Sequence, residues 1–206
     1  MRLHPDYQDS RIRFFLGDVR DLARLERAFG GVHVVVHAAA LKQVPATEYN
    51  PFEAVKTNIL GSQNVVDAAL NKRVEKVMLI SSDKAVWPIN LYGATKLAAE
   101  KLFVASNVYS PDGRTKLSVV RYGNVIGSRG SFVELLRLRK DGEPITITDE
   151  RMTRFWIRID QVVEVILQAI ERMQGGEIFV PKMKNLSIVD VAKLLAPDAP
   201  IDLIGV

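Results

Sequence analysis

Ser82, Tyr92 and Lys96 are the side chains in this sequence whose types and spacing could together move a proton. Tyr92 and Lys96 are four residues apart, so on a helix both side chains lie on one face. A free tyrosine has a pKa of about 10, and a nearby lysine ammonium favours the phenolate. A phenolate beside a nicotinamide cofactor can take the proton of a sugar hydroxyl. The spacing alone also suits an exposed surface pair, but the upstream hydroxyl of Ser82 favours catalysis.

Apolar runs that alternate with helical patterns predict the elements that hold these residues, as βαβ units of a parallel sheet. The predicted strands cover residues 12–16, 32–36, 77–80, 117–121, 145–148 and 178–180. The predicted helices cover residues 21–29, 50–71, 92–107, 160–173 and 187–195. The helix-start signals are Asp21, Asn50 with Pro51 and Glu53, Ser131 with Glu134, Asp160, and Ser187.

Small and polar residues collect where the predicted strands end. Asp18, residues 38–42, residues 81–84 and residues 122–129 each follow a strand. Because ligands of open parallel sheets gather at the carboxyl ends of the strands, we expect the binding site at this edge.

Composition excludes several classes of protein. The chain has 206 residues, of which 48% are hydrophobic and 25% charged, as in a soluble globular protein. The absence of cysteine excludes disulfides, thiolate metal sites and cysteine nucleophiles, and the histidines have no metal-ligand spacing. A net charge of +4 without a basic cluster suits an anionic small substrate better than nucleic acid. No apolar run is long enough to cross a membrane and no secretory signal is visible, so we expect a cytoplasmic location.

Longer motifs carry a resemblance to a known family. They are residues 37–45, 56–61, 82–85, 88–96, 121–131 and 151–156. In order and spacing these blocks resemble the CapD-like polysaccharide-biosynthesis family, a branch of the extended short-chain dehydrogenase/reductases that acts on nucleotide sugars. The resemblance runs from about Arg11 to the end of the chain.

The resemblance implies an NADP-dependent lyase that dehydrates UDP-N-acetylglucosamine to a 4-keto-6-deoxy sugar through transient oxidation at C4. Tyr92 would deprotonate O4 with the help of Ser82, and Lys96 would hold the cofactor ribose and lower the pKa of the tyrosine. Lys84 would take the C5 proton, and Asp83 would protonate the departing O6. Because relatives that retain the C5 configuration have Glu where this chain has Lys84, the resemblance implies inversion at C5. The alternative is that Asp83 and Lys84 form a solvated turn.

The resemblance also implies further contacts, each of which a turn or packing role could explain instead. The expected cofactor-binding residues, besides Tyr92 and Lys96, are Asp18, Val19, Ala38, Ala39, Lys42, Val125, Ile126, Gly127, Ser128 and Arg129. The expected substrate-binding residues are Lys42, Asn124, Gly130, Thr146 and Thr148. No metal is expected.

The expected fold is α/β: a Rossmann-like parallel sheet with helices on both faces, plus a small mixed C-terminal substrate lobe. Residues 1–130 would form an incomplete NADP-binding domain, and residues 131–206 a partial substrate lobe interwoven with the last strands. The family's first strands and Gly-rich phosphate loop are absent from this sequence, which predicts a chain truncated at both ends. Alone, such a chain is expected to be poorly stable or to dimerise through open strand edges, and to bind NADP weakly.

Two other functions stay open. One is a UDP-N-acetylglucosamine epimerase of the same family, which would use Tyr92 and Lys96 without expelling water. The other is an inactive fragment or binding module that lacks the phosphate loop. In its full-length form the protein is expected to be a homo-oligomer.

Overall fold

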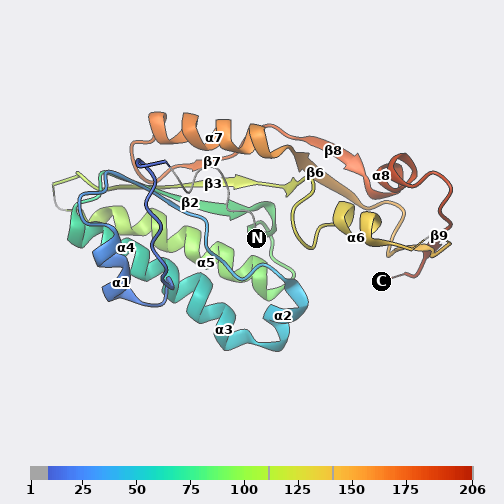
Figure 1. The fold of residues 1–206 in the computed structure, drawn as a ribbon, viewed down its shortest axis with the longest axis horizontal. Coiled ribbons are helices and arrows are strands. Elements are labelled where there is room, and N and C mark those ends of the chain that lie inside the picture. Colours follow the sequence, from blue (N-terminus) through green and yellow to red (C-terminus); the bar gives the residue numbers. More distant parts are fainter. Residues whose placement is uncertain (1–8, 111, 141, 206) are drawn as a thin grey trace.

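The structure, a computed structural model, describes residues 9–110, 112–140 and 142–205. Its centre is a parallel sheet with the strand order β1-β2-β3-β7 (Figure 1). These strands are β1 (Val34–His37), β2 (Lys76–Ser82), β3 (Lys116–Tyr122) and β7 (Ile178–Phe179). The last residues of β2 and β3 pair with each other, so both strands end at the same edge of the sheet.

Helices cover both faces of this sheet (Figure 1). α4 (Gly61–Lys72) and α5 (Leu91–Ala105) pack on one face, against a core that includes Leu79. α7 (Ile159–Arg172) packs on the other face, where Met78 is buried. Because β2 is covered on both sides, its sequence is a continuous apolar run without alternation. The predicted α/β class, with helices on both faces of a parallel sheet, is confirmed.

Shorter helices fill the connections between the strands and the long helices. They are α1 (Leu22–Ala28), α2 (Val44–Tyr49), α3 (Pro51–Val55), a π-helical turn (Lys56–Leu60) and two 3-10 turns (Asp83–Ala85 and Ser106–Tyr109). α5 begins after Asn90, whose side-chain oxygen accepts a hydrogen bond of 2.9 Å from the amide of Gly93. This cap fixes the first turn of α5, which carries Tyr92.

The C-terminal part of the chain adds a small mixed lobe (Figure 1). Its elements are β4 (Asn124–Val125), α6 (Phe132–Leu138), β5 (Ile145–Ile147), β6 (Thr153–Ile157), β8 (Lys184–Ser187), α8 (Ile188–Leu195) and β9 (Ile201–Leu203). β6 pairs in parallel with β4 and antiparallel with β8, and β5 pairs in parallel with β9. The expected mixed lobe is confirmed, whereas the division of the chain at residue 130 stays a prediction.

The predicted strand over residues 12–16 is wrong. In the described part of the chain this segment joins no sheet, and β1 is the edge strand. Phe15 stacks under the guanidinium of Arg24 at 5.2 Å, and the backbone carbonyl of Leu16 accepts a bond of 2.7 Å from the same side chain. An apolar run forms a strand only where its backbone groups can hydrogen-bond with those of a neighbouring strand. Here a side chain of α1 bonds with the backbone instead.

One predicted helix start needs correction, and one predicted helix is less regular than expected. The helix over residues 50–71 is preceded by α2, and its middle is a π-helical turn. Asn50 and Pro51 hold the N-cap and first helical positions of α3, as predicted, but the Asn50 side chain makes no cap bond; its amide donates back to the Ala46 carbonyl at 3.1 Å. α7 is capped by Arg158, which leaves Asp160 inside the first turn. The predicted caps at Asp21, Ser131 and Ser187 are confirmed.

No helix within the described residues is both long and apolar enough to cross a membrane.

Candidate active site

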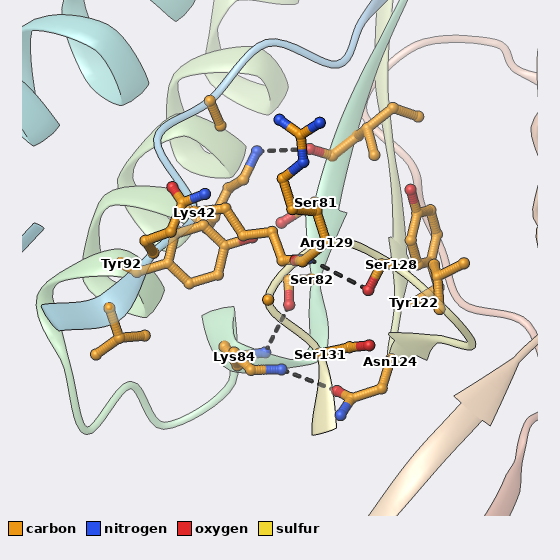
Figure 2. Close-up of a pocket in the computed structure, with 18 of the residues that line it drawn as sticks. Lys42, Ser81, Ser82, Lys84, Tyr92, Tyr122, Asn124, Ser128, Arg129 and Ser131 are labelled. Carbon is orange, nitrogen blue, oxygen red and sulfur yellow. Dashed lines mark hydrogen bonds between the residues drawn. The ribbon is translucent and has the colours of Figure 1, made fainter. Parts of the chain in front are cut away.

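A cavity of about 600 Å³ opens at the carboxyl edge of the sheet, between the sheet and the C-terminal lobe (Figure 2). Its walls come from the loop after β1, the ends of β2 and β3, the first turns of α5, and residues 123–132. This is the edge at which the sequence predicted a ligand. The predicted Ser82, Tyr92 and Lys96 all line the cavity.

Ser82, Tyr92 and Lys96 are buried side by side at the junction of β2 and α5. Their exposed fractions are 8%, 8% and 5%. Ser82 is the last residue of β2, and its hydroxyl donates to the Asp83 carboxylate at 3.0 Å and accepts from the Lys84 amide at 3.3 Å. The fixed hydroxyl also hydrogen-bonds the phenol of Tyr92. The three side chains predicted to act together therefore meet in one buried place.

The electrostatics of Tyr92 and Lys96 differ from the sequence-based expectation. Burial raises the pKa of Tyr92, and its hydrogen bond with Ser82 opposes that shift only in part. Burial also lowers the pKa of Lys96 to about 8. The Lys96 ammonium donates to the backbone carbonyl of Ile80 at 2.8 Å. The expected lowering of the tyrosine pKa by Lys96 is thus wrong for this structure, because the desolvation of the phenol dominates.

Asp83 and Lys84 form a turn at the wall of the cavity. The Lys84 ammonium is 3.1 Å from the Asp83 carboxylate. It is also 3.0 Å from the side-chain oxygen of Asn124 (Figure 2). Lys84 lines the main cavity. A second cavity, of about 340 Å³, is lined by both Asp83 and Lys84. Lys84 therefore lies between the two cavities, and the catalytic role of the pair stays a prediction.

The cofactor contacts implied by the resemblance divide into two groups. Ala38, Lys42, Val125, Ser128 and Arg129 line the main cavity with Tyr92 and Lys96. The Lys42 ammonium lies 3.3 Å from the Ser128 hydroxyl and 3.0 Å from the Arg129 carbonyl (Figure 2). Cationic, hydroxyl and small side chains suit the sugar and phosphate groups of a dinucleotide, so this part of the chain fits a nicotinamide cofactor.

The other expected cofactor contacts lie outside the cavity wall. Ala39, Ile126 and Gly127 are exposed neighbours of lining residues. Asp18 is paired with Arg20 at 2.7 Å, which lowers the pKa of Asp18 to about 2. Val19 packs against the apolar core of the sheet, next to α4.

The expected substrate contacts divide in the same way. Asn124 and Gly130 line the main cavity together with Lys42. Thr146 lies in β5 with an exposed side chain, and Thr148 follows it. Neither threonine lines either of the two cavities, so their uridine-binding role stays a prediction.

Several lining residues were missed by the sequence prediction. Tyr122 ends β3, and Gln43 stands at the start of α2. Ser131 and Phe132 begin α6. The sequence placed Tyr122 at this sheet edge, within residues 122–129, but did not assign it a role in the site. The others depend on how α2 and α6 pack, which the spacing does not reveal. Among the described residues, no group of three or more histidine or carboxylate side chains could hold a metal ion.

Comparisons with known proteins agree with this geometry. The family described as "Polysaccharide biosynthesis protein" matches residues 1–205. A UDP-N-acetylglucosamine 4,6-dehydratase (inverting) from Campylobacter jejuni subsp. jejuni serotype O:2 is 50% identical over 197 residues, which are 95% of this chain and 59% of the relative. A UDP-glucose 4-epimerase from Rickettsia rickettsii (strain Sheila Smith) is 45% identical over 186 residues, or 90% of this chain and 54% of the epimerase.

The solved structures give the same result. The X-ray structure of Pen from Bacillus thuringiensis superposes with a TM-score of 0.91 at 39% identity, covering 98% of this chain and 66% of that one. This chain thus spans only about three fifths of the length of the dehydratase it resembles. With the family match over nearly every residue, and the sheet, the lobe and the Ser82–Tyr92–Lys96 cavity in place, the chain belongs to the polysaccharide biosynthesis protein family.

Proposed function

We propose that this chain carries the catalytic part of a sugar-nucleotide dehydratase that converts UDP-N-acetylglucosamine to a UDP-4-keto-6-deoxy sugar with inversion at C5. The observation that carries the proposal is that Tyr92, Lys96 and Lys84 line one cavity, with Ser82 and Asn124 in the same wall. One group can act at O4 and another at C5 of the same sugar. The dehydratase from Campylobacter jejuni, at 50% identity, supports this choice of reaction.

The cofactor we propose is NADP, held by Lys42, Lys96, Ser128 and Arg129 along the cavity wall. When bound, it supplies reversible oxidation at C4 of the sugar. Lys96 is the buried cation of this wall, and its bond with the Ile80 carbonyl fixes the direction of its ammonium group.

Tyr92 is the proposed base for the O4 proton. Burial holds the phenol in its protonated form, so the deprotonated form needs nearby positive charge and the Ser82 hydrogen bond to become accessible. Lys96, one helical turn away, is the cation of this chain that is placed to provide it. The buried location keeps water from competing for the proton, because neither side chain is more than 8% exposed.

Asp83 and Lys84 are the proposed acid and base of the elimination. At 3.1 Å, one proton can pass from the Lys84 ammonium to the Asp83 carboxylate, which leaves a neutral amine and a carboxylic acid. The amine then takes the C5 proton, and the acid protonates O6 so that it departs as water. The hydride removed from C4 would return to C6, a transfer that the bound cofactor would supply. A solvent-derived proton added to C5 on the face opposite to Lys84 would give inversion. Asn124, whose oxygen is 3.0 Å from Lys84, holds the amine in position.

The test is an incubation of the 206-residue chain with UDP-N-acetylglucosamine and NADP⁺, followed by mass spectrometry of the sugar nucleotide. Loss of one water is expected, and in D₂O the product should carry deuterium at C5. Lys84→Met should abolish the water loss. Lys101→Met, which removes an exposed lysine of α5, is the matched control and should leave it intact. A sugar nucleotide recovered with unchanged mass and configuration would overturn the proposal.

An epimerase is the second candidate, favoured by the Rickettsia relative at 45% identity. It would use Tyr92 and Lys96 in the same way, and Asp83 and Lys84 would take no part in the reaction. Formation of an epimeric UDP-sugar of unchanged mass, insensitive to Lys84→Met, would select this reaction. A cytoplasmic location and a homo-oligomeric full-length protein complete the proposal.

A further inference from the structure

α5 contacts the end of β2 at three positions that are four residues apart. Tyr92 bonds with the Ser82 hydroxyl, and the Lys96 ammonium bonds with the Ile80 carbonyl. One turn further, the carboxylate of Glu100 accepts a hydrogen bond of 2.5 Å from the Ser81 hydroxyl. Positions spaced by four lie on one helix face, so this face carries the two catalytic groups and then a carboxylate.

Glu100 is the most deeply buried charged side chain of this face, with 1% exposure. It binds Arg121 near the end of β3 through two nitrogens of the guanidinium, one of them Nε at 3.0 Å. Arg121 precedes Tyr122, which lines the cavity. The single carboxylate thus connects α5, β2 and β3 at the places where they form the cavity wall.

Stability alone does not explain a buried ion pair at this position. Apolar residues of similar volume would serve the packing equally well or better, because the Glu100 carboxylate loses its hydration and the Arg121 guanidinium loses part of its own. Lys96, one turn away, is itself a buried cation whose protonated form is penalised by burial. A negative charge placed next to it on the same helix face offsets that penalty.

The other ionisable groups around Lys96 do not supply this negative charge. They are His37 at the end of β1, Asp83 after β2, Arg121 and Tyr122 on β3, and Tyr92 on α5. His37 is held neutral by burial and by the charge of Lys96, and Tyr92 is protonated. Asp83 is paired with Lys84. Glu100 is the group whose charge raises the pKa of Lys96 against the effect of burial.

We propose that Glu100, braced by Arg121 and Ser81, is a positioning residue that keeps Lys96 charged and fixed one helical turn from the catalytic tyrosine. Its role in turnover rests on the proposed function, whereas its effect on Lys96 does not. Glu100 touches neither cavity and acts only through Lys96 and through the placement of α5.

The first experiment measures Lys96 directly, by NMR of the chain labelled with ¹³C at the lysine Cε atoms, across a pH series. Lys96→Met identifies its signal. Glu100→Gln should move the Lys96 titration midpoint about one pH unit toward acid. Ser81→Ala removes the hydrogen bond and keeps the charge, so it should leave the midpoint unchanged. Glu164→Gln, which removes an exposed carboxylate of α7, is the matched control. An unchanged midpoint in Glu100→Gln would overturn the proposal.

Glu100→Asp covers the case in which Glu100→Gln does not fold. It keeps a buried carboxylate but withdraws it by one methylene, so the Lys96 midpoint should shift toward acid by less than a full unit. A midpoint equal to or above that of the wild type would contradict the proposal.

The second experiment compares pH profiles of the water-loss reaction. The alkaline limb should move to lower pH in Glu100→Gln, with kcat lowered about fivefold near pH 8 and KM for UDP-N-acetylglucosamine nearly unchanged. A lowered kcat with an unmoved alkaline limb would indicate a merely structural role and overturn the proposal. If the wild type releases no water at all, the proposed function fails, and the NMR titration still decides whether Glu100 controls the charge of Lys96.

Discussion

His37 should cause the fold to lose stability in mild acid. It ends β1, is 4% exposed, stacks on Phe103 at 6.0 Å, and lies with Nε2 at 3.0 Å from the Ser62 hydroxyl. Ser62 donates its own hydrogen to the Asn58 carbonyl at 2.6 Å, so Nε2 of the neutral imidazole is the donor to Ser62. Burial first, and the charge of Lys96 second, lower the pKa of His37 to about 4.

The size of the effect follows from the two protonation equilibria. The unfolded chain binds a proton at this histidine below about pH 6.5, whereas the folded chain binds it only below about pH 4. Stability is therefore fully present above that window and falls as the pH drops through it. At roughly 1.4 kcal/mol per pH unit, the loss is about 3 kcal/mol. That is a large part of the roughly 5–15 kcal/mol by which a typical domain is stable.

Urea unfolding at about pH 7 and about pH 4 measures this loss. Between those conditions, the free energy of unfolding of the wild type should fall by about 3 kcal/mol more than that of His37→Gln, whose side chain stays neutral. His33→Gln, which replaces an exposed histidine of the same segment, should follow the wild type. If His37→Gln and the wild type lose stability in parallel, the assignment of a buried neutral imidazole is refuted.

Three further substitutions test other parts of the structure. Gly93→Ala should abolish water loss because its Cβ would lie 2.2 Å from the Lys84 carbonyl oxygen, whereas Gly30→Ala, with its nearest atom at 3.6 Å, should retain wild-type activity. Arg73→Gly should raise the free energy of unfolding by about 1 kcal/mol, since Arg73 has a φ of 57° at the end of α4; a lowered thermal midpoint would contradict this. Asn124→Leu should slow C5 deuterium exchange about tenfold by removing the oxygen 3.0 Å from Lys84, and unchanged exchange would exclude the contact.

The parts of the fold that the sequence predicted correctly are those whose signals are local. β2 is a buried apolar run flanked by polar residues, and α5 begins at a side-chain cap one residue before its first apolar position. These two elements alone bring Ser82, Tyr92 and Lys96 together. Their meeting was predictable because parallel strands end at a common edge and because residues four apart share a helix face.

The parts that failed depend on neighbours that a local pattern does not contain. Residues 12–16 are as apolar as a strand, but a strand forms only when its backbone pairs with that of another strand. Here the Leu16 carbonyl is bonded instead to a side chain of α1. Asp160 has the residue type of a helix cap, but α7 begins at Ile159, after Arg158. Asn50 does precede the first residue of α3, but its side chain makes no cap bond. Predicting the pKa of Tyr92 would have required knowing how deeply the phenol is buried, because burial is the main cause that raises it.

The buried polar groups of α5 give the strongest physical reason to place function here. A helix that only had to cover β2 would present leucine or methionine, because every buried charge and hydroxyl costs desolvation free energy. α5 instead presents Tyr92, Thr95, Lys96 and Glu100, all buried, and each has a specific partner on a neighbouring element or in its own turn. Apolar packing would stabilise the fold at least as well as this network does. What it provides is a tyrosine, a lysine and their hydrogen-bond partners held in one geometry, which is what the proposed proton transfer requires.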